Sequence, residues 1–143
     1  MHKVFIDGAS GTTGLRLYER LSQREDIQIL EIPESIRKDI NAKAELAKEA
    51  EITFLCLPDD AAKEAVNAYK NTRIIDTSCA HRVEKGWVYG LPELSYNQRE
   101  AIKNADKVAV PGCHAGGFNT IVYPLTAKGI IPKDYPIVCH SVT

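Results

Sequence analysis

Short apolar runs alternate with helix-like segments along most of the 143 residues of this chain. The runs predict buried strands at residues 4–6, 27–32, 52–57, 73–76, 108–110 and 137–142. Turn residues separate them, for example Pro33 after the second run and Pro58 after the third. Alternating strands and helices predict an α/β fold, with a doubly wound parallel sheet covered by helices on both faces.

The segments between these runs show helical features. Leu15, Tyr18 and Leu21 recur at helical spacing, so the first helix is expected to turn this face toward a core. Ser95 and Gln98 have the spacing of a capping box, which predicts a helix that ends near residue 104. Further helices are expected over about 44–50, 59–69 and 113–128.

Composition excludes several classes of protein. The chain has 18 Lys and Arg against 19 Asp and Glu. It therefore lacks the excess of positive charge that would indicate a nucleic-acid or membrane partner. No apolar run approaches the roughly 18 residues of a membrane span, and the N-terminus does not resemble a signal peptide. The four cysteines form no CxxC pair, so no metal site is expected. We therefore expect a cytoplasmic protein with free thiols and with neither a nucleic-acid nor a membrane partner.

A glycine motif lies between the first expected strand and the first expected helix. A Rossmann-like fold binds the pyrophosphate of a dinucleotide at this place, because glycine allows close approach and the helix N-terminus donates N–H groups. The candidate cofactor-binding residues are Gly8, Ser10, Gly11, Thr12, Thr13 and Gly14. The spacing GxxGxxG differs from the common GxGxxG, so a plain tight turn is the alternative.

The end of the second expected strand bears on the choice between NAD and NADP. Glu31 lies where an acid would bind a ribose hydroxyl. Ser35, Arg37 and Lys38 follow it, and this group is suited to a 2′-phosphate. A solvated charged loop explains the same residues, and by themselves they favour NADP(H) only slightly.

Cys113 is the candidate nucleophile. Pro111 favours an extended residue before it, Gly112 permits a sharp turn, and Cys113 would then begin a helix. The positive end of a helix dipole stabilises a thiolate, although a buried inert thiol is the ordinary alternative for a cysteine. Cys56 and Cys139 lie in apolar runs and are expected in the core.

Two further residues are candidates for binding substrate. Arg82 follows the fourth expected strand and suits an anionic group, unless it lies in an exposed surface loop. Glu93 either assists the site or caps the helix after Ser95. Cys79 is in the loop before Arg82 and is a weaker candidate. His114 is expected to be a wall of the site or to face solvent, rather than to act as a base for its neighbour.

The motifs GASGTTG, DTSCAHR, YGLPEL and VPGCHAGGF occur in this order between Gly8 and Phe118. Together they resemble the N-acetyl-γ-glutamyl-phosphate reductases, most closely the short form. The resemblance implies reduction of N-acetylglutamyl phosphate by NADPH in arginine biosynthesis. Cys113 would displace phosphate to give a thioester, and hydride from NADPH would release N-acetylglutamate semialdehyde.

The resemblance also implies two domains. A dinucleotide-binding domain would span 1–112, and 113–143 would hold the nucleophile helix and the first strand of a second α+β domain that is cut off. The acid–base histidine would lie beyond residue 143, so the chain should bind cofactor but turn over poorly. The full-length protein would be a homo-oligomer.

Three other functions are consistent with parts of the sequence, one of them a thiol redox sensor in which Cys79 would be the resolving cysteine. An aspartate-semialdehyde dehydrogenase shares the chemistry, but its nucleophile normally follows asparagine, which the Pro111-Gly112-Cys113 sequence does not match. A non-catalytic nucleotide-binding module would bind NADPH with an unreactive Cys113.

Overall fold

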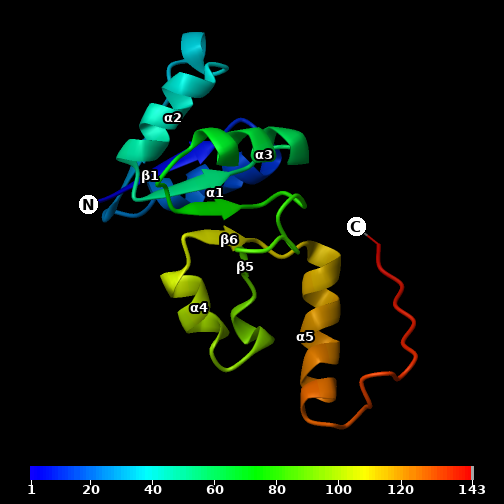
Figure 1. The fold of residues 1–143 in the computed structure, drawn as a ribbon. Coiled ribbons are helices and arrows are strands. Elements are labelled where there is room, and N and C mark those ends of the chain that lie inside the picture. Colours follow the sequence, from blue (N-terminus) through cyan, green and yellow to red (C-terminus); the bar gives the residue numbers. More distant parts are fainter. Residues whose placement is uncertain (143) are drawn as a thin grey trace.

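A computed structural model describes residues 1–142 of the chain. Within these residues, six strands form one sheet in the order β2-β1-β3-β4-β6-β5, and every neighbouring pair is parallel. The strands are β1 His2–Asp7, β2 Ile27–Leu30, β3 Ile52–Leu55, β4 Ile74–Asp76, β5 Val88–Tyr89 and β6 Lys107–Ala109. Figure 1 shows them stacked between the helices. The predicted α/β, doubly wound parallel sheet is confirmed.

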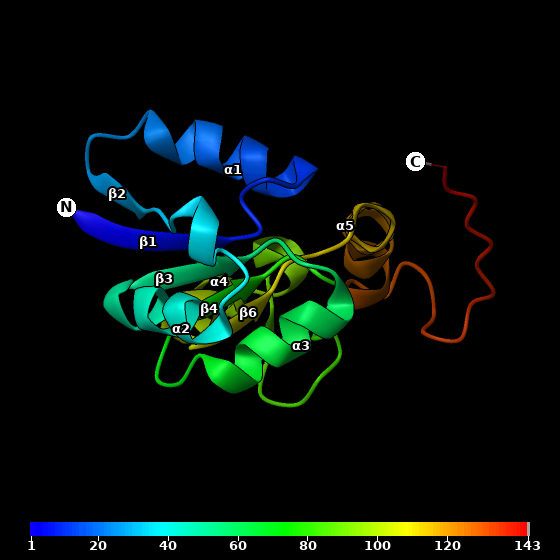
Figure 2. The ribbon, with the colours of Figure 1, turned by 90° about the horizontal axis from the view of Figure 1, so that it is seen from above.

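Helices cover both faces of the sheet. They are α1 Thr12–Ser22, α2 Ile40–Glu49, α3 Asp59–Ala68, α4 Gln98–Asn104 and α5 Cys113–Ala127, with short 3-10 turns η1 Glu34–Ile36 and η2 Pro92–Leu94. Figure 2 shows α1 on one side of the strands, with α2 and α3 together on the other. The strand order explains this, because the chain steps from β1 to β2 in one direction and from β2 to β3 in the other.

The main core lies between the sheet and the pair α2–α3. Phe5, Leu55 and Ile74 contribute large buried side chains, and small alanines such as Ala47 and Ala62 allow the helices to approach closely. On the opposite face α1 buries only Gly14. Leu15 is 52% exposed, so the prediction that it faces the core is wrong: the close approach of Gly14 to the preceding loop sets which side of α1 is covered.

Residues 137–142 do not form the predicted strand. A strand needs a partner for its N–H and C=O groups, and this stretch runs beside α5 instead of along the sheet (Figure 1). The Oγ atom of Ser141 is hydrogen-bonded to Nδ1 of His114 near the start of α5. Cys139 is therefore exposed, which corrects the expectation that it lies in the core.

The segment between β4 and β6 also differs from expectation. β5 was not predicted, because it has two residues and exists only through its pairing with β6. Helix α4 begins at Gln98 after Asn97 without a side-chain capping bond, so the capping box at Ser95 is wrong. The Gln98 side chain instead donates from Nε2 to the Tyr89 carbonyl oxygen at 2.5 Å.

Membrane-spanning helices and metal-binding clusters are both absent from the residues that the structure describes. Between residues 1 and 142, no helix has both the length and the apolar character that crossing a membrane requires. Within the same range, no three His, Cys, Asp or Glu side chains are grouped so that they could hold a metal ion.

Candidate active site

The loop between β1 and α1 has two glycines that backbone packing requires. Gly8 has a φ of +89°, and a Cβ there would lie 2.2 Å from the Cys56 carbonyl oxygen. A Cβ on Gly14 would lie 2.1 Å from the Gly8 carbonyl oxygen. Gly11 is different, because its backbone is extended at a φ of −80° and its nearest neighbour would be 3.5 Å away. Packing within the chain therefore does not require a glycine at position 11.

A pocket of about 460 Å³ lies beside this loop. Of the predicted cofactor-binding residues, Gly8, Ser10, Arg37 and Lys38 line it. Gly11, Thr12, Thr13 and Gly14 continue from the loop into the first turn of α1. Ser35 lies in η1, is exposed and is not part of the lining. The structure thus brings most of the predicted set to one place, and their roles stay predictions.

The floor of the pocket holds an ion pair that the sequence analysis missed. Asp7, the last residue of β1, is 3% exposed, and its Oδ1 lies 2.8 Å from Nζ of Lys43 on α2. The hydroxyl of Tyr69 donates to Oδ2 of the same carboxylate at 2.6 Å. Burial together with this hydrogen bond raises the pKa of Tyr69. An acid directly after an apolar strand was the only signal in the sequence for this cluster.

The far end of the pocket carries mixed charge. The Tyr18 hydroxyl donates to Oε1 of Glu31 at 2.6 Å, and this bond raises the pKa of Tyr18. Arg37 pairs with Glu34 at 3.0 Å, while Lys38 makes no ion pair within residues 1–142. At this end of the pocket, the ammonium group of Lys38 thus has no contact with a carboxylate of the described residues.

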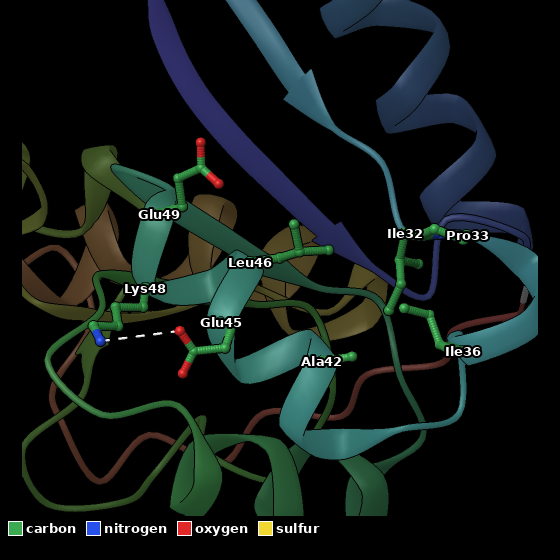
Figure 3. Close-up of a pocket in the computed structure, with 8 residues that line it drawn as sticks. All are labelled: Ile32, Pro33, Ile36, Ala42, Glu45, Leu46, Lys48 and Glu49. Carbon is green, nitrogen blue, oxygen red and sulfur yellow. Dashed lines mark ion pairs between the residues drawn. The ribbon is translucent and has the colours of Figure 1, made fainter.

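A second hollow of about 480 Å³ adjoins the same connection between β2 and α2 (Figure 3). Its walls are apolar at Ile32, Pro33, Ile36 and Leu46, and its rim carries an exposed ion pair on α2. None of the predicted catalytic, cofactor-binding or substrate-binding residues lines it.

Cys113 is exposed and is the first residue of α5, directly after the Gly112 N-cap. The turn follows β6, and the glycine loop and the loop after β4 follow parallel strands of the same sheet. All three therefore open at the carboxyl edge, where α/β sheets bind ligands. The predicted helix start at Cys113 is confirmed.

Arg82 is partly buried and holds several backbone groups of this edge. Its Nε donates to the Val110 carbonyl oxygen at 3.0 Å and Nη2 donates to that of Thr77 at 3.1 Å. Nη1 donates to Sγ of Cys79 at 3.1 Å. These contacts are wrong for an exposed surface-loop residue, which was the alternative expectation for Arg82.

Cys56 lies at the end of β3 and is only partly buried, so the expectation of a core cysteine is met in part. Burial raises the pKa of its thiol, and a hydrogen bond with Thr77 opposes this rise. Cys79 is exposed beside Arg82.

Glu93 does not cap α4, which begins at Gln98 after Asn97. It lines a hollow of about 320 Å³ between η2 and the middle of α5, together with Asn119 and Tyr123. The structure thus brings Glu93 to the nucleophile helix, but about two turns beyond Cys113.

Comparisons with known proteins agree with this arrangement. Residues 32–105, more than half of the chain, match the family described as semialdehyde dehydrogenase, NAD binding domain. The chain belongs to this family. It is 48% identical over 99% of its length to an N-acetyl-gamma-glutamyl-phosphate reductase of Trichormus variabilis, of which it covers 44%. It is 49% identical over 98% of its length to N-acetyl-gamma-glutamyl-phosphate reductase 2 of Pseudomonas putida, of which it covers 45%. The chain thus spans less than half the length of these relatives.

Solved structures show the same fold. An aspartate semialdehyde dehydrogenase with NADP from Candida albicans superposes with a TM-score of 0.64 at 15% identity, covering 90% of this chain and 47% of that one. The enzyme from Francisella tularensis gives a TM-score of 0.60 at 20% identity, covering 78% of this chain and 36% of that one. The predicted Rossmann-like, dinucleotide-binding fold is therefore confirmed.

Proposed function

We propose that this chain is the cofactor-binding and nucleophile-bearing part of an N-acetyl-γ-glutamyl-phosphate reductase of arginine biosynthesis. The reaction converts N-acetylglutamyl phosphate, NADPH and a proton into N-acetylglutamate semialdehyde, phosphate and NADP⁺. The observation that carries the proposal is the position of Cys113, which begins α5 at the same sheet edge as the glycine loop. The names of relatives at 48–49% identity support it.

The residues around the glycine loop fit a dinucleotide. The space beside Gly11 is not filled by another part of the protein, so a ligand can approach the backbone there. The N-terminus of α1 supplies N–H donors for a pyrophosphate. Lys38 and Arg37 line the other end of the pocket, which suits the 2′-phosphate of NADP(H). When bound, NADPH supplies the hydride for the reduction.

Cys113 performs the covalent step in this proposal. Its sulfur attacks the acyl carbon of the substrate, the C–O bond to phosphate breaks, and a thioester on Cys113 results. The first backbone N–H group of α5 that bonds within the helix is that of Gly116, which donates to the Gly112 carbonyl oxygen at 2.7 Å. The N–H groups of residues 113–115 precede it and can donate to the oxyanion of the tetrahedral intermediate.

Arg82 and Glu93 remain our candidates for contacting substrate. A guanidinium has five N–H groups, and three of those of Arg82 donate to Val110, Thr77 and Cys79. The other two make no hydrogen bond within residues 1–142, and in this proposal they donate to a phosphate or carboxylate of the substrate. Glu93 lines the hollow against α5, where a longer part of the substrate would lie.

We also propose that residues 113–143 begin a second domain and that the complete protein is a homo-oligomer. Helix α5 has no buried residue, and Ile121 is 67% exposed. Its apolar side chains therefore face a region that residues 1–142 do not fill. The relatives, which are more than twice as long, have the chain length for such a domain.

The test is to trap the acyl group. The chain is incubated with freshly prepared N-acetylglutamyl phosphate without NADPH, and its peptides are mapped by mass spectrometry. We expect the N-acetylglutamyl group on Cys113, none in a Cys113→Ser variant, and unchanged labelling in a Cys139→Ser control. Equal labelling of all cysteines would overturn the proposal. Preference for aspartyl phosphate would instead support the aspartate-semialdehyde dehydrogenase reading.

A further inference from the structure

A buried polar cluster beneath the carboxyl edge has no part in the function proposed above. Asp76, the last residue of β4, is 0% exposed, and its carboxylate accepts three hydrogen bonds. Ser78 donates from its backbone N–H at 3.0 Å and from Oγ at 2.6 Å, and His81 donates from Nδ1 at 2.7 Å. A fully buried carboxylate is costly unless such donors satisfy it, so this cluster fixes the loop that follows β4.

His81 fixes the far end of that loop through two contacts. It is 3% exposed, and its ring stacks on Trp87 with 4.2 Å between centroids and 11° between planes. The imidazole is thus held on one side by the Asp76 carboxylate and on its face by the Trp87 indole. Since Arg82 is the next residue, these contacts determine where the Arg82 side chain starts.

The Arg82 guanidinium reaches from this loop to the nucleophile turn. Through Nε it holds the Val110 carbonyl oxygen, three residues before Cys113. Its Nη1 lies 2.5 Å from the position that a Cβ on Gly112 would occupy. Gly112 is the N-cap of α5, so the guanidinium fills the space directly behind the start of the nucleophile helix.

We propose that Arg82 is a positioning residue for Cys113, and that the Asp76–His81 pair holds Arg82 in place for this role. The inference rests on the proposed function, in which Cys113 is the nucleophile. The planar guanidinium binds Thr77 after β4 and Val110 after β6 at once, which a flexible ammonium does not reproduce. It therefore fixes the start of α5 relative to the sheet, and with it the direction of the Cys113 sulfur.

The experiment measures the alkylation rate of Cys113 relative to that of Cys139 in the same folded chain, by peptide mapping with iodoacetamide. Cys139 is exposed in the C-terminal stretch and serves as an internal reference. We expect the Arg82→Gln variant to lower the Cys113 to Cys139 ratio about tenfold, which is less than the roughly hundredfold loss that a misplacement of about 1 Å can cause at a reacting centre. Thermal unfolding of each variant shows that it is folded.

Arg73 provides the matched control. Its Nη2 donates to the Ile102 and Lys103 carbonyl oxygens at 3.0 and 2.8 Å, so it too binds backbone groups, but at the end of α4. An Arg73→Gln variant should lose stability without changing the Cys113 to Cys139 ratio. A fall in the ratio in this control as large as in Arg82→Gln would show a general structural effect and overturn the proposal.

Two variants at His81 separate the position of the guanidinium from its presence, because both keep Arg82. His81→Phe keeps an aromatic ring beside Trp87 but removes the donor to Asp76, and it should lower the ratio. His81→Asn retains a donor near the Nδ1 position and should recover at least half of the wild-type ratio.

Two outcomes distinguish the proposals. A wild-type Cys113 that reacts no faster than Cys139 would argue against the proposed function itself. A fast wild-type Cys113 whose rate is unchanged in both Arg82→Gln and His81→Phe would overturn only the positioning role.

Discussion

Gly14 lies directly against the backbone of Gly8, since a Cβ on Gly14 would be 2.1 Å from the Gly8 carbonyl oxygen. This contact joins the first turn of α1 to the end of β1 and sets the shape of the loop between them. The loop borders the pocket that we assign to the dinucleotide. The same few residues therefore determine both the packing of α1 on β1 and the shape of the binding pocket.

The two glycines at positions 14 and 11 should therefore respond differently to alanine. Gly14→Ala forces a carbonyl oxygen to move and should destabilise the fold by about 3 kcal/mol, at the upper end for overpacked sites. Gly11→Ala, with only a 3.5 Å contact, should change stability by less than about 0.5 kcal/mol. It should nevertheless weaken NADPH binding, because the cofactor approaches there. Urea unfolding and calorimetric titration measure the two effects, and equal stability of both variants would contradict the assignment.

Lys38 should favour NADPH over NADH. We expect Lys38→Gln to weaken NADPH binding about tenfold, the size of one lost charge-assisted hydrogen bond, and to leave NADH binding unchanged. Lys63→Gln on α3, whose ammonium is exposed, is the control. Titration of each variant with both cofactors measures the ratio, and a parallel loss for NADH would place Lys38 away from the 2′-phosphate.

The Lys43–Asp7 pair should be important for stability. Lys43→Met leaves the Asp7 carboxylate buried with only the Tyr69 hydroxyl, and this should cost about 3 kcal/mol. Lys48→Met removes an exposed ammonium 4.0 Å from Glu45 and should cost less than about 1 kcal/mol. Denaturant midpoints at one pH compare the two, and similar losses would show that burial of the Asp7 pair has no special effect.

Cys56 should be the slowest of the four cysteines to alkylate near pH 7.5. The thiolate is the reactive form, and burial raises the pKa of Cys56, so its thiolate fraction at this pH is below that of an ordinary cysteine. Its rate should rise with pH over a higher range than the rate of an ordinary cysteine. Labelling in strong denaturant should remove the difference. A folded chain in which Cys56 and Cys139 react equally fast at pH 7.5 would contradict the raised pKa.

The parts of the fold that sequence predicted correctly are those set by neighbouring residues. The glycine loop and the helix start at Cys113 depend on a few adjacent residues with strong backbone preferences. The runs of β1, β3 and β4 carry apolar residues on both faces, as is typical of central parallel strands, with Thr53 and Asp76 as buried polar exceptions.

The parts that it missed depend on partners distant in the chain. Residues 88–89 form a strand because β6 lies beside them, whereas residues 137–142 have stronger strand preferences and no partner strand. Lys43 meets Asp7 only through the packing of α2 on β1, so neither residue signals the other. The stacking of His81 on Trp87 is likewise invisible in the sequence, because the residues next to His81 do not indicate Trp87 as its partner.

The space behind the nucleophile turn is shared by two residues and is large enough for only one side chain. The Arg82 guanidinium occupies this space, and Gly112 has no side chain that would compete for it. A Cβ added to Gly112 would lie 2.5 Å from Nη1 of Arg82. Any larger residue at 112 must therefore displace the guanidinium, and any shorter residue at 82 opens a cavity that a side chain at 112 could fill. The two positions are therefore coupled, so a change at one alters which residues the other tolerates.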